Sequence, residues 1–272
     1  MSTALEILRL GYMVWWRQIK QMLRYKANFV FGLIDTVAWS VAMLLLVPLY
    51  TASGVGSAIG TQNFISFLLL GFAFQMYQSV ALWSASNTLQ NELNLGIVDY
   101  VFSSPVSRYW YMVSTSIANA LNETLFFIPM FMVALIFTNF TFSILDLLFS
   151  LSAVALTVGV LIQLGVFFST ITLQFKQVSS IFGFLNLAFT MLTGMLIPIQ
   201  VLPEALRLAS LIFPQTLGID LARHFILHTS PTFPILFQWV MLLLELLILG
   251  LVSTIALRYV ERTAKREGLH YV

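Results

Sequence analysis

Long apolar runs alternate with short polar turns along almost the entire chain. Six runs reach about 20 residues, the length that an α-helix needs to cross the hydrocarbon core of a bilayer. They cover residues 28–50, 64–85, 109–137, 145–173, 178–199 and 233–258. The turns between them are too short for a soluble domain. The pattern therefore predicts an all-α membrane protein with six transmembrane helices, a single transmembrane domain over 1–272 with its core over 28–258.

The segment before the first span, residues 1–27, has too many charges to cross a membrane, but its pattern is helical. At about 100° per residue, the charged side chains from Glu6 to Arg24 fall within an arc of about 80°, and the apolar ones occupy the other side. The charged set is Glu6, Arg9, Arg17, Lys20 and Arg24, and the apolar set is Ile7, Leu8, Val14, Trp15, Ile19 and Met22. We expect an amphipathic interfacial helix on the membrane surface. A role in gating substrate is the alternative interpretation.

Composition supports this class, and the placement of charge predicts the orientation. The 272 residues are 59% hydrophobic and 9% charged, far less charge than a soluble domain carries. With the N-terminus inside, eleven of the 13 Lys and Arg residues are cytoplasmic, and only Arg207 and Arg223 are outside. We expect a multi-pass protein of the cell (inner or plasma) membrane with both termini, including a tail over 259–272, in the cytoplasm. No basic patch for nucleic acid and no removable signal peptide is visible.

Two segments depart from a simple series of spans. Residues 89–108, LQNELNLGIVDYVFSSPVSR, are too polar to cross and predict a short helix on the inner surface. The stretches PEALRLASLIF and QTLGIDLARHFIL, of 11 and 13 residues, flank Pro214 on the outer side. Apolar helices this short are tolerated at membrane depth only when they are buried in protein or line a cavity. We therefore expect an extracellular re-entrant helical hairpin between spans five and six.

Three short motifs occur in these segments and carry a family resemblance. GIVD at 96–99 precedes SPVSR at 104–108, GMLIP at 194–198 precedes LPEALR at 202–207, and PQT at 214–216 precedes DLAR at 220–223. In this order, on a six-span frame, they resemble the permease (transmembrane) subunits of type 2 ABC exporters, which export drugs, lipids or polysaccharides. The chain departs from the family pattern at Ile97, Asp99, Ala205 and Phe213, where Thr, Glu, an aromatic residue and Asn are usual.

The resemblance implies a homodimeric pore in the lipid bilayer with two copies of a cytoplasmic ABC ATPase subunit. The chain has no G-x-x-x-x-G-K-[ST] loop, so we expect no ATPase site and no cofactor on it, with ATP and Mg on the partner. Residues 89–107 would act as the coupling helix, although an ordinary interfacial helix is the alternative. The implied ATPase-coupling residues are Glu92, Leu93, Gly96, Ile97, Asp99, Phe102, Pro105 and Arg108. The implied outer gate is Pro198, Pro203, Pro214, Asp220 and Arg223.

Two carboxylates fall in the middle of predicted spans, Glu123 in the third and Glu245 in the sixth. An ionised carboxylate there is unfavourable by about 2.5–3.5 kcal/mol, so neither should face lipid charged. One interpretation is a translocation path with Asn119 and Asn122 as neighbours. The other is a protonated or hydrogen-bonded contact between helices, to which Asp35 could also belong.

Competing classes remain open at this stage. The chain has no Cys, and His224 and His228 form H-F-I-L-H without the Glu of a zinc protease, so we expect no catalytic residue and no metal site. An ion-coupled carrier or channel that uses Glu123 and Glu245 is a further alternative. The 24 Phe residues and the short outer loops favour an amphipathic, drug-like or lipid-linked cargo. A polysaccharide or glycolipid is the alternative cargo.

Overall fold

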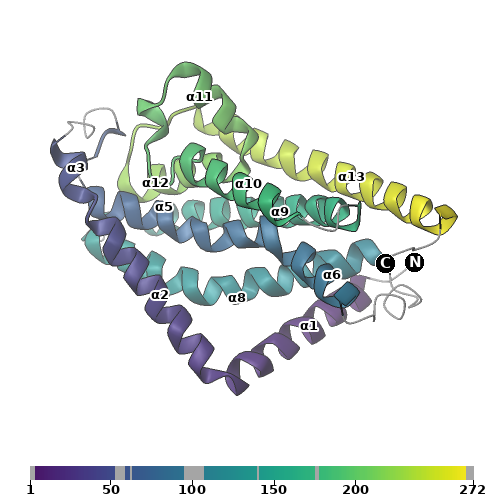
Figure 1. Cartoon of the computed structure of the whole chain (residues 1–272). Coiled ribbons are helices and arrows are strands. Elements are labelled where there is room, and N and C mark those ends of the chain that lie inside the picture. Colours follow the sequence, from purple (N-terminus) through teal and green to yellow (C-terminus); the bar gives the residue numbers. More distant parts are fainter. Residues whose placement is uncertain are drawn as a thin grey trace.

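The protein is described from a computed structural model, which covers residues 4–52, 59–61, 63–94, 107–139, 141–174 and 178–267. Every regular element in these ranges is helical (Figure 1). Five helices are long and apolar enough to cross a membrane. They are Phe29–Ala52, Phe64–Thr88, Arg108–Phe137, Ile144–Thr172 and Ile235–Val260. The prediction of an all-α chain with several membrane-spanning helices is thereby confirmed.

The helices follow one another in the order that the apolar runs predict. The first half contains α1 (Ala4–Arg24), α2 (Lys26–Leu44), α3 (Val47–Ala52), α5 (Phe64–Ser79), the π-helical turn η1 (Val80–Ser84), α6 (Ala85–Asn94) and α8 (Arg108–Phe137). The second half contains α9 (Ile144–Gln174), α10 (Ser179–Leu192), η2 (Ile199–Val201), α11 (Glu204–Ala209), η3 (Ser210–Ile212), α12 (Pro214–Leu227) and α13 (Ile235–Glu267). The elements η2 and η3 are single 3-10 turns.

The second span, formed by α5, η1 and the start of α6, is the centre of the bundle. Of its most apolar stretch 78% is buried, against 6% for the first span. Its residues are apolar on all sides, as is typical of a helix surrounded by protein. It packs against α8, α9, α10 and α12, and the largest buried side chains include its Phe67 and Phe74. The buried polar side chains of α5, Ser66 and Gln78, are therefore surrounded by other helices.

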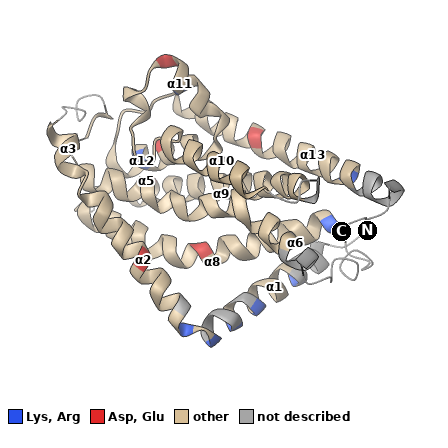
Figure 2. Ribbon diagram, viewed as in Figure 1, with Lys and Arg blue, Asp and Glu red and all other residues tan. Residues whose placement is uncertain are grey.

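Helix α1 covers most of the predicted amphipathic segment. It packs along α8, and its side chains Arg9, Arg17, Lys20 and Arg24 are exposed. Figure 2 shows cationic residues along α1 and near the ends of α8 and α13. This placement agrees with the predicted helical periodicity, while a position in the plane of the membrane stays a prediction.

The fifth predicted span is shorter than expected. The sequence predicts a helix over 178–199, but α10 ends at Leu192 after 14 residues, which rise only about 21 Å against a hydrocarbon core of about 30 Å. Gly194 follows with φ +79°, a left-handed conformation that ends helices, and Pro198 stands four residues further on. A sixth full-length helix is therefore not confirmed.

The connections expected on the outer side lie together at one end of the bundle. The Ser230 amide donates to the Ile59 carbonyl at 3.1 Å, and the Asn63 amide group donates to the Phe137 carbonyl at 2.7 Å. The start of α8 and the end of α13 meet at the opposite end, which also carries α6 (Figure 1). The two ends are thus separated as the predicted topology requires.

Candidate functional site

Helix α12 carries the most buried charges in the described part of the chain. It begins with Pro214, whose missing N–H would have no helical partner in the first turn. It ends at Leu227 and is followed by His228 in a left-handed conformation. It packs on α9, α5 and α13, and every residue from Pro214 to Arg223 is buried. The predicted outer-gate residues Asp220 and Arg223 are 4% and 3% exposed. Neither could stay there charged without partners.

Arg223 joins α5 to the chain that follows α10. Its Nε and Nη2 donate to the Phe67 carbonyl at 3.0 and 2.8 Å, Nη1 donates to the Gly194 carbonyl at 2.6 Å, and Nη2 donates to the Met195 carbonyl at 3.1 Å. Its guanidinium carbon lies 3.5 Å from the centre of the Phe67 ring. Gly71 on α5 makes this approach possible, because a Cβ there would overlap Nη2.

The carbonyls bound by Arg223 explain why a charge is buried here. Gly194 and Met195 lie just beyond the end of α10, where carbonyls have no helical donors. Irregular backbone deep in a membrane protein must be satisfied by other protein groups, and a planar guanidinium can serve several carbonyls at once. Burial lowers the pKa of Arg223, and the neighbouring Asp220 carboxyl acts in the opposite direction.

Asp220 binds the segment that leads into α13. Its Oδ2 accepts from the Thr232 amide and from Gln238 Nε2, both at 2.8 Å, and its Oδ1 accepts from the Thr232 hydroxyl at 3.0 Å. Burial raises the pKa of this carboxyl, and these bonds together with Arg223 act in the opposite direction. We call Asp220, Arg223 and the groups they bind the outer latch, because they hold α5, the end of α10 and the start of α13 to α12.

The three predicted gate prolines flank the outer latch. Pro198 is buried before the 3-10 turn η2, Pro203 is exposed before α11, and Pro214 is the first residue of α12.

The sequence did not predict two further residues of this region. Gln200 donates to the Ser230 carbonyl at 3.2 Å, and Gln238 is one of the partners of Asp220. For Gln238 the sequence contained an indication of a buried polar contact, because its amide side chain lies early in an otherwise apolar run.

A second polar cluster lies between α8 and the buried central span. Ser79 donates to Glu123 Oε1 at 2.9 Å, Tyr77 and Thr124 share a hydrogen bond at 2.9 Å, and Asn119 donates to the Ser84 hydroxyl at 2.7 Å. Ser84 also lies 3.4 Å from the Ser116 hydroxyl. We call these seven residues the polar seam. It brings together two of the predicted path residues, Asn119 and Glu123.

The π-helical turn η1 lies within the polar seam, between Ser79 and the end of the turn at Ser84. A π turn carries one extra residue and therefore changes which side chains face a neighbouring helix. Such turns are frequent at functional sites. Gly165 of α9 lies against this turn, where a Cβ would meet the Val80 carbonyl at 2.7 Å. The helix is therefore held closely in this conformation.

The other two predicted path residues are placed differently. Asn122 is half-buried on α8. Glu245 lies on α13, and its Oε2 is buried with no hydrogen-bond partner in the described ranges. Helix α13 packs chiefly on α9, whereas α8 packs on α5 and α1. No bond between described atoms joins Glu123 to Glu245, so the structure does not assemble them into one site.

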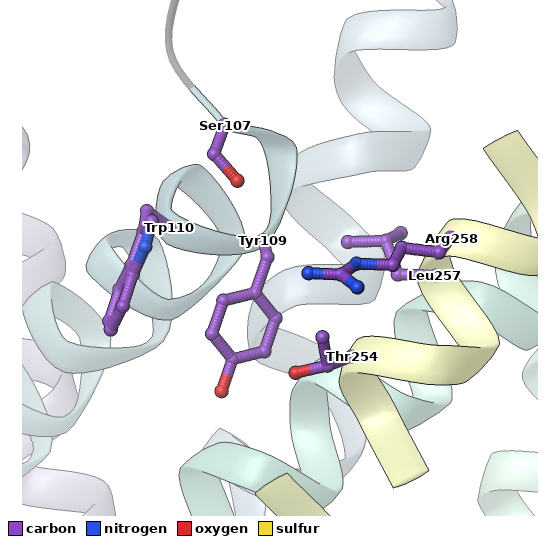
Figure 3. A pocket seen from close by; sticks show the side chains of 6 residues that line it. All are labelled: Ser107, Tyr109, Trp110, Thr254, Leu257 and Arg258. Carbon is purple, nitrogen blue, oxygen red and sulfur yellow. The ribbon is translucent and has the colours of Figure 1, made fainter. Parts of the chain in front are cut away.

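The predicted coupling segment is only partly described. Glu92 and Leu93 lie in α6, and Arg108 is the first residue of α8. Gly96, Ile97, Asp99, Phe102 and Pro105 lie outside the described residues, so their role stays a prediction. Close to Arg108, a cavity of about 310 Å³ lies between α8 and α13. Its described lining is Ser107, Tyr109, Trp110, Thr254, Leu257 and Arg258 (Figure 3).

His224 and His228 both lie at the end of α12. His224 Nδ1 lies 2.7 Å from the Thr229 carbonyl, next to the turn that ends α12. Among the residues searched, which are those that the structure describes, no three His, Asp or Glu side chains could hold a metal ion together.

Comparison with known families agrees with this architecture. The family model of ABC-2 type transporters matches residues 10–227. The chain therefore belongs to the ABC-2 type transporter family and is a multi-pass permease subunit of an ABC transporter. The matched region is a membrane domain and not an ATPase domain, and permeases of this family pair with ABC ATPase subunits. No curated protein matched the chain in a sequence comparison.

Proposed function

We propose that two copies of this chain form a pore that exports an amphipathic, drug-like or lipid-linked substrate from the cytoplasm or the inner leaflet. Two cytoplasmic ATPase subunits would supply the energy, and residues 89–107 would be the coupling helix. The observation that carries the proposal is the polar seam, a row of hydroxyl, amide and carboxylate groups between two spans of a family permease. Such groups inside a membrane typically mark a substrate path.

The position of the coupling segment supports this mechanism. Residues 95–107 connect the end of α6, which continues the central span, to the start of α8, and the polar seam lies between these two spans. A displacement of that connection by ATP binding would move α6, η1 and α5 relative to α8. At its other end α5 carries Phe67, whose carbonyl accepts from Arg223 of the outer latch. The same helix thus links the proposed motor contact to the proposed outer gate.

The proposed orientation puts both termini and the coupling segment in the cytoplasm, as the distribution of Lys and Arg favours. The absence of Cys makes this simple to test. In intact cells, a membrane-impermeant thiol reagent should label Thr141→Cys, in the link between α8 and α9. It should label Ser107→Cys only after permeabilisation. Both side chains are exposed, so reversed labelling would show the opposite orientation.

The transport proposal is tested by purifying the chain with an ABC ATPase subunit that associates with it and screening cargoes for stimulation of ATP hydrolysis. Glu123→Gln should lower cargo-stimulated turnover by about tenfold, because it removes the carboxyl group to which Ser79 donates at the seam. Glu204→Gln, an exposed site on α11, is the matched control. Unchanged turnover in Glu123→Gln would exclude the seam from the path.

A polysaccharide or glycolipid is the second candidate cargo, since hydroxyl and amide groups such as those of Ser84 and Asn119 also suit sugar hydroxyls. Stimulation by lipid-linked sugars and not by hydrophobic drugs would identify it. Transport that continues without ATP and follows a proton gradient would instead identify an ion-coupled carrier.

A further inference from the structure

The cavity between α8 and α13 is not used by the mechanism above. It measures about 310 Å³, at the lower end of the range for small-molecule sites of about 300–1,000 Å³. In Figure 3 the guanidinium of Arg258 points across the gap toward Tyr109, with Ser107 and Thr254 on either side. Its described lining contains a cation and three hydroxyl groups but no carboxylate. The Tyr109 and Thr254 hydroxyls already donate to the Gln163 side chain and the Gly250 carbonyl, so Arg258 and Ser107 are the lining groups that would donate to a ligand. A guanidinium beside a hydroxyl favours an anion such as a phosphate.

The cavity has an ordered wall. Tyr109 donates to Gln163 Oε1 at 2.9 Å, and the Ser253 hydroxyl lies 3.3 Å from the same oxygen. Gln163 belongs to α9, so its side chain ties the start of α8 to α13 and keeps the two helices at a defined distance. The lining therefore comes from neighbouring helices held in fixed positions, which a binding site requires.

The place of the cavity indicates where the anion comes from. The spans Arg108–Phe137 and Ile235–Val260 begin and end here, so the cavity lies at the level of lipid headgroups. Trp110 in its lining and Tyr259, which follows Arg258 in the chain, are exposed, and aromatic side chains of this kind concentrate at the membrane interface. The exposed apolar side chains Leu251 and Ile255 continue from it along α13 toward the membrane interior. They offer a surface for acyl chains.

We propose that this cavity binds the phosphate group of an anionic phospholipid, with Arg258 as the principal contact and the acyl chains along α13. The shared chemistry is a phosphate anion, which a soluble phosphate could also supply. The site would make the junction of α8 and α13 sensitive to the lipid composition of the leaflet. Only its assignment to the cytoplasmic leaflet rests on the proposed orientation, and binding itself can be measured without transport.

The test is native mass spectrometry of the purified full-length chain, titrated with phosphatidylglycerol or with phosphatidylcholine of the same acyl chains. The wild type should bind phosphatidylglycerol more tightly. Arg258→Gln should weaken that binding by about fivefold, the effect expected of one basic residue near an anionic lipid, and leave phosphatidylcholine unchanged. Arg258→Lys should keep part of the preference. Arg207→Gln on α11 removes the same charge at a remote place and should have no effect.

Three results would overturn the proposal. Equal affinity of wild type and Arg258→Gln for phosphatidylglycerol would show that the cavity is not the site. Inorganic phosphate that binds the detergent-purified chain and displaces the lipid at equal concentration would identify a soluble ligand instead. Weaker association of Arg258→Gln with the ATPase subunit, with lipid binding unchanged, would assign the cavity to the motor interface. None of these results depends on the export of any cargo.

Discussion

Replacement of Arg223 by Met tests whether the outer latch holds the permease together. The substitution keeps a long side chain in the space beside Phe67 but removes all four hydrogen bonds to backbone carbonyls. The carbonyls of Gly194 and Met195 follow the end of α10, so they lose their donors. A buried carbonyl left without a donor costs about 1–3 kcal/mol, and two of them give about 2–6 kcal/mol.

Part of this loss is offset, because Met does not have to be desolvated as a charge. We therefore expect a net decrease in the free energy of unfolding of about 3 kcal/mol. For a chain of this size that corresponds to a decrease in Tm of about 6–12 °C. Tryptophan fluorescence during thermal unfolding in detergent measures it, since the chain contains six Trp residues and the substitution changes none of them.

The matched control is Arg207→Met on α11, which removes a cation outside the buried core and should change the stability by no more than about 0.5 kcal/mol. Arg223→Lys should recover little of the loss, because one ammonium group cannot serve carbonyls on both sides as a planar fork does. A Tm for Arg223→Met within about 2 °C of the wild type would refute the argument that these carbonyls depend on Arg223.

Three further predictions concern the same bundle and use the same unfolding measurement. Gly71→Ala should destabilise the protein by about 1–3 kcal/mol, because its Cβ would overlap the Arg223 guanidinium, and an unchanged Tm would show that the latch is loose. Asp220→Asn should lower the free energy of unfolding by about 1.5–3 kcal/mol, because the charge-assisted hydrogen bonds from Thr232 and Gln238 are lost. A decrease in Tm no larger than that of Glu204→Gln would contradict this. Glu245→Leu should leave the Tm unchanged or raise it, because one oxygen of this buried carboxyl has no hydrogen-bond partner in the described bundle, whereas a marked decrease would indicate a stabilising partner.

For the carboxylates within the spans, the sequence predicted the depth in the membrane but not the hydrogen-bond partners. Their depth followed from hydropathy, since Glu123 and Glu245 fall near the middle of long apolar runs. Their partners did not follow, because Ser79 is 44 residues away from Glu123 along the chain, and one helical face cannot be matched to another without the packing. The sequence assigned both residues to one candidate translocation path, while the structure puts Glu123 in the polar seam and Glu245 on α13.

For the fifth predicted span, the sequence overestimated the length of the helix. Its apolar composition predicted a helix over 178–199, but helix length also depends on whether carbonyls find donors elsewhere. Arg223, 29 residues beyond Gly194, supplies those donors and permits the early end at Leu192. Hydropathy measures the preference of side chains for lipid and contains no information about such distant backbone partners.

By itself the sequence determined the class of protein and the approximate limits of five spans. The length and hydropathy of an apolar run depend only on consecutive residues, so the sequence is enough to identify a membrane-spanning helix. The tertiary structure decided which polar groups meet, where the fifth helix ends and that a cavity opens at the junction of α8 and α13. Directional hydrogen bonds and the shape of a cavity depend on the relative placement of segments far apart in the chain, and only the packed bundle defines that placement.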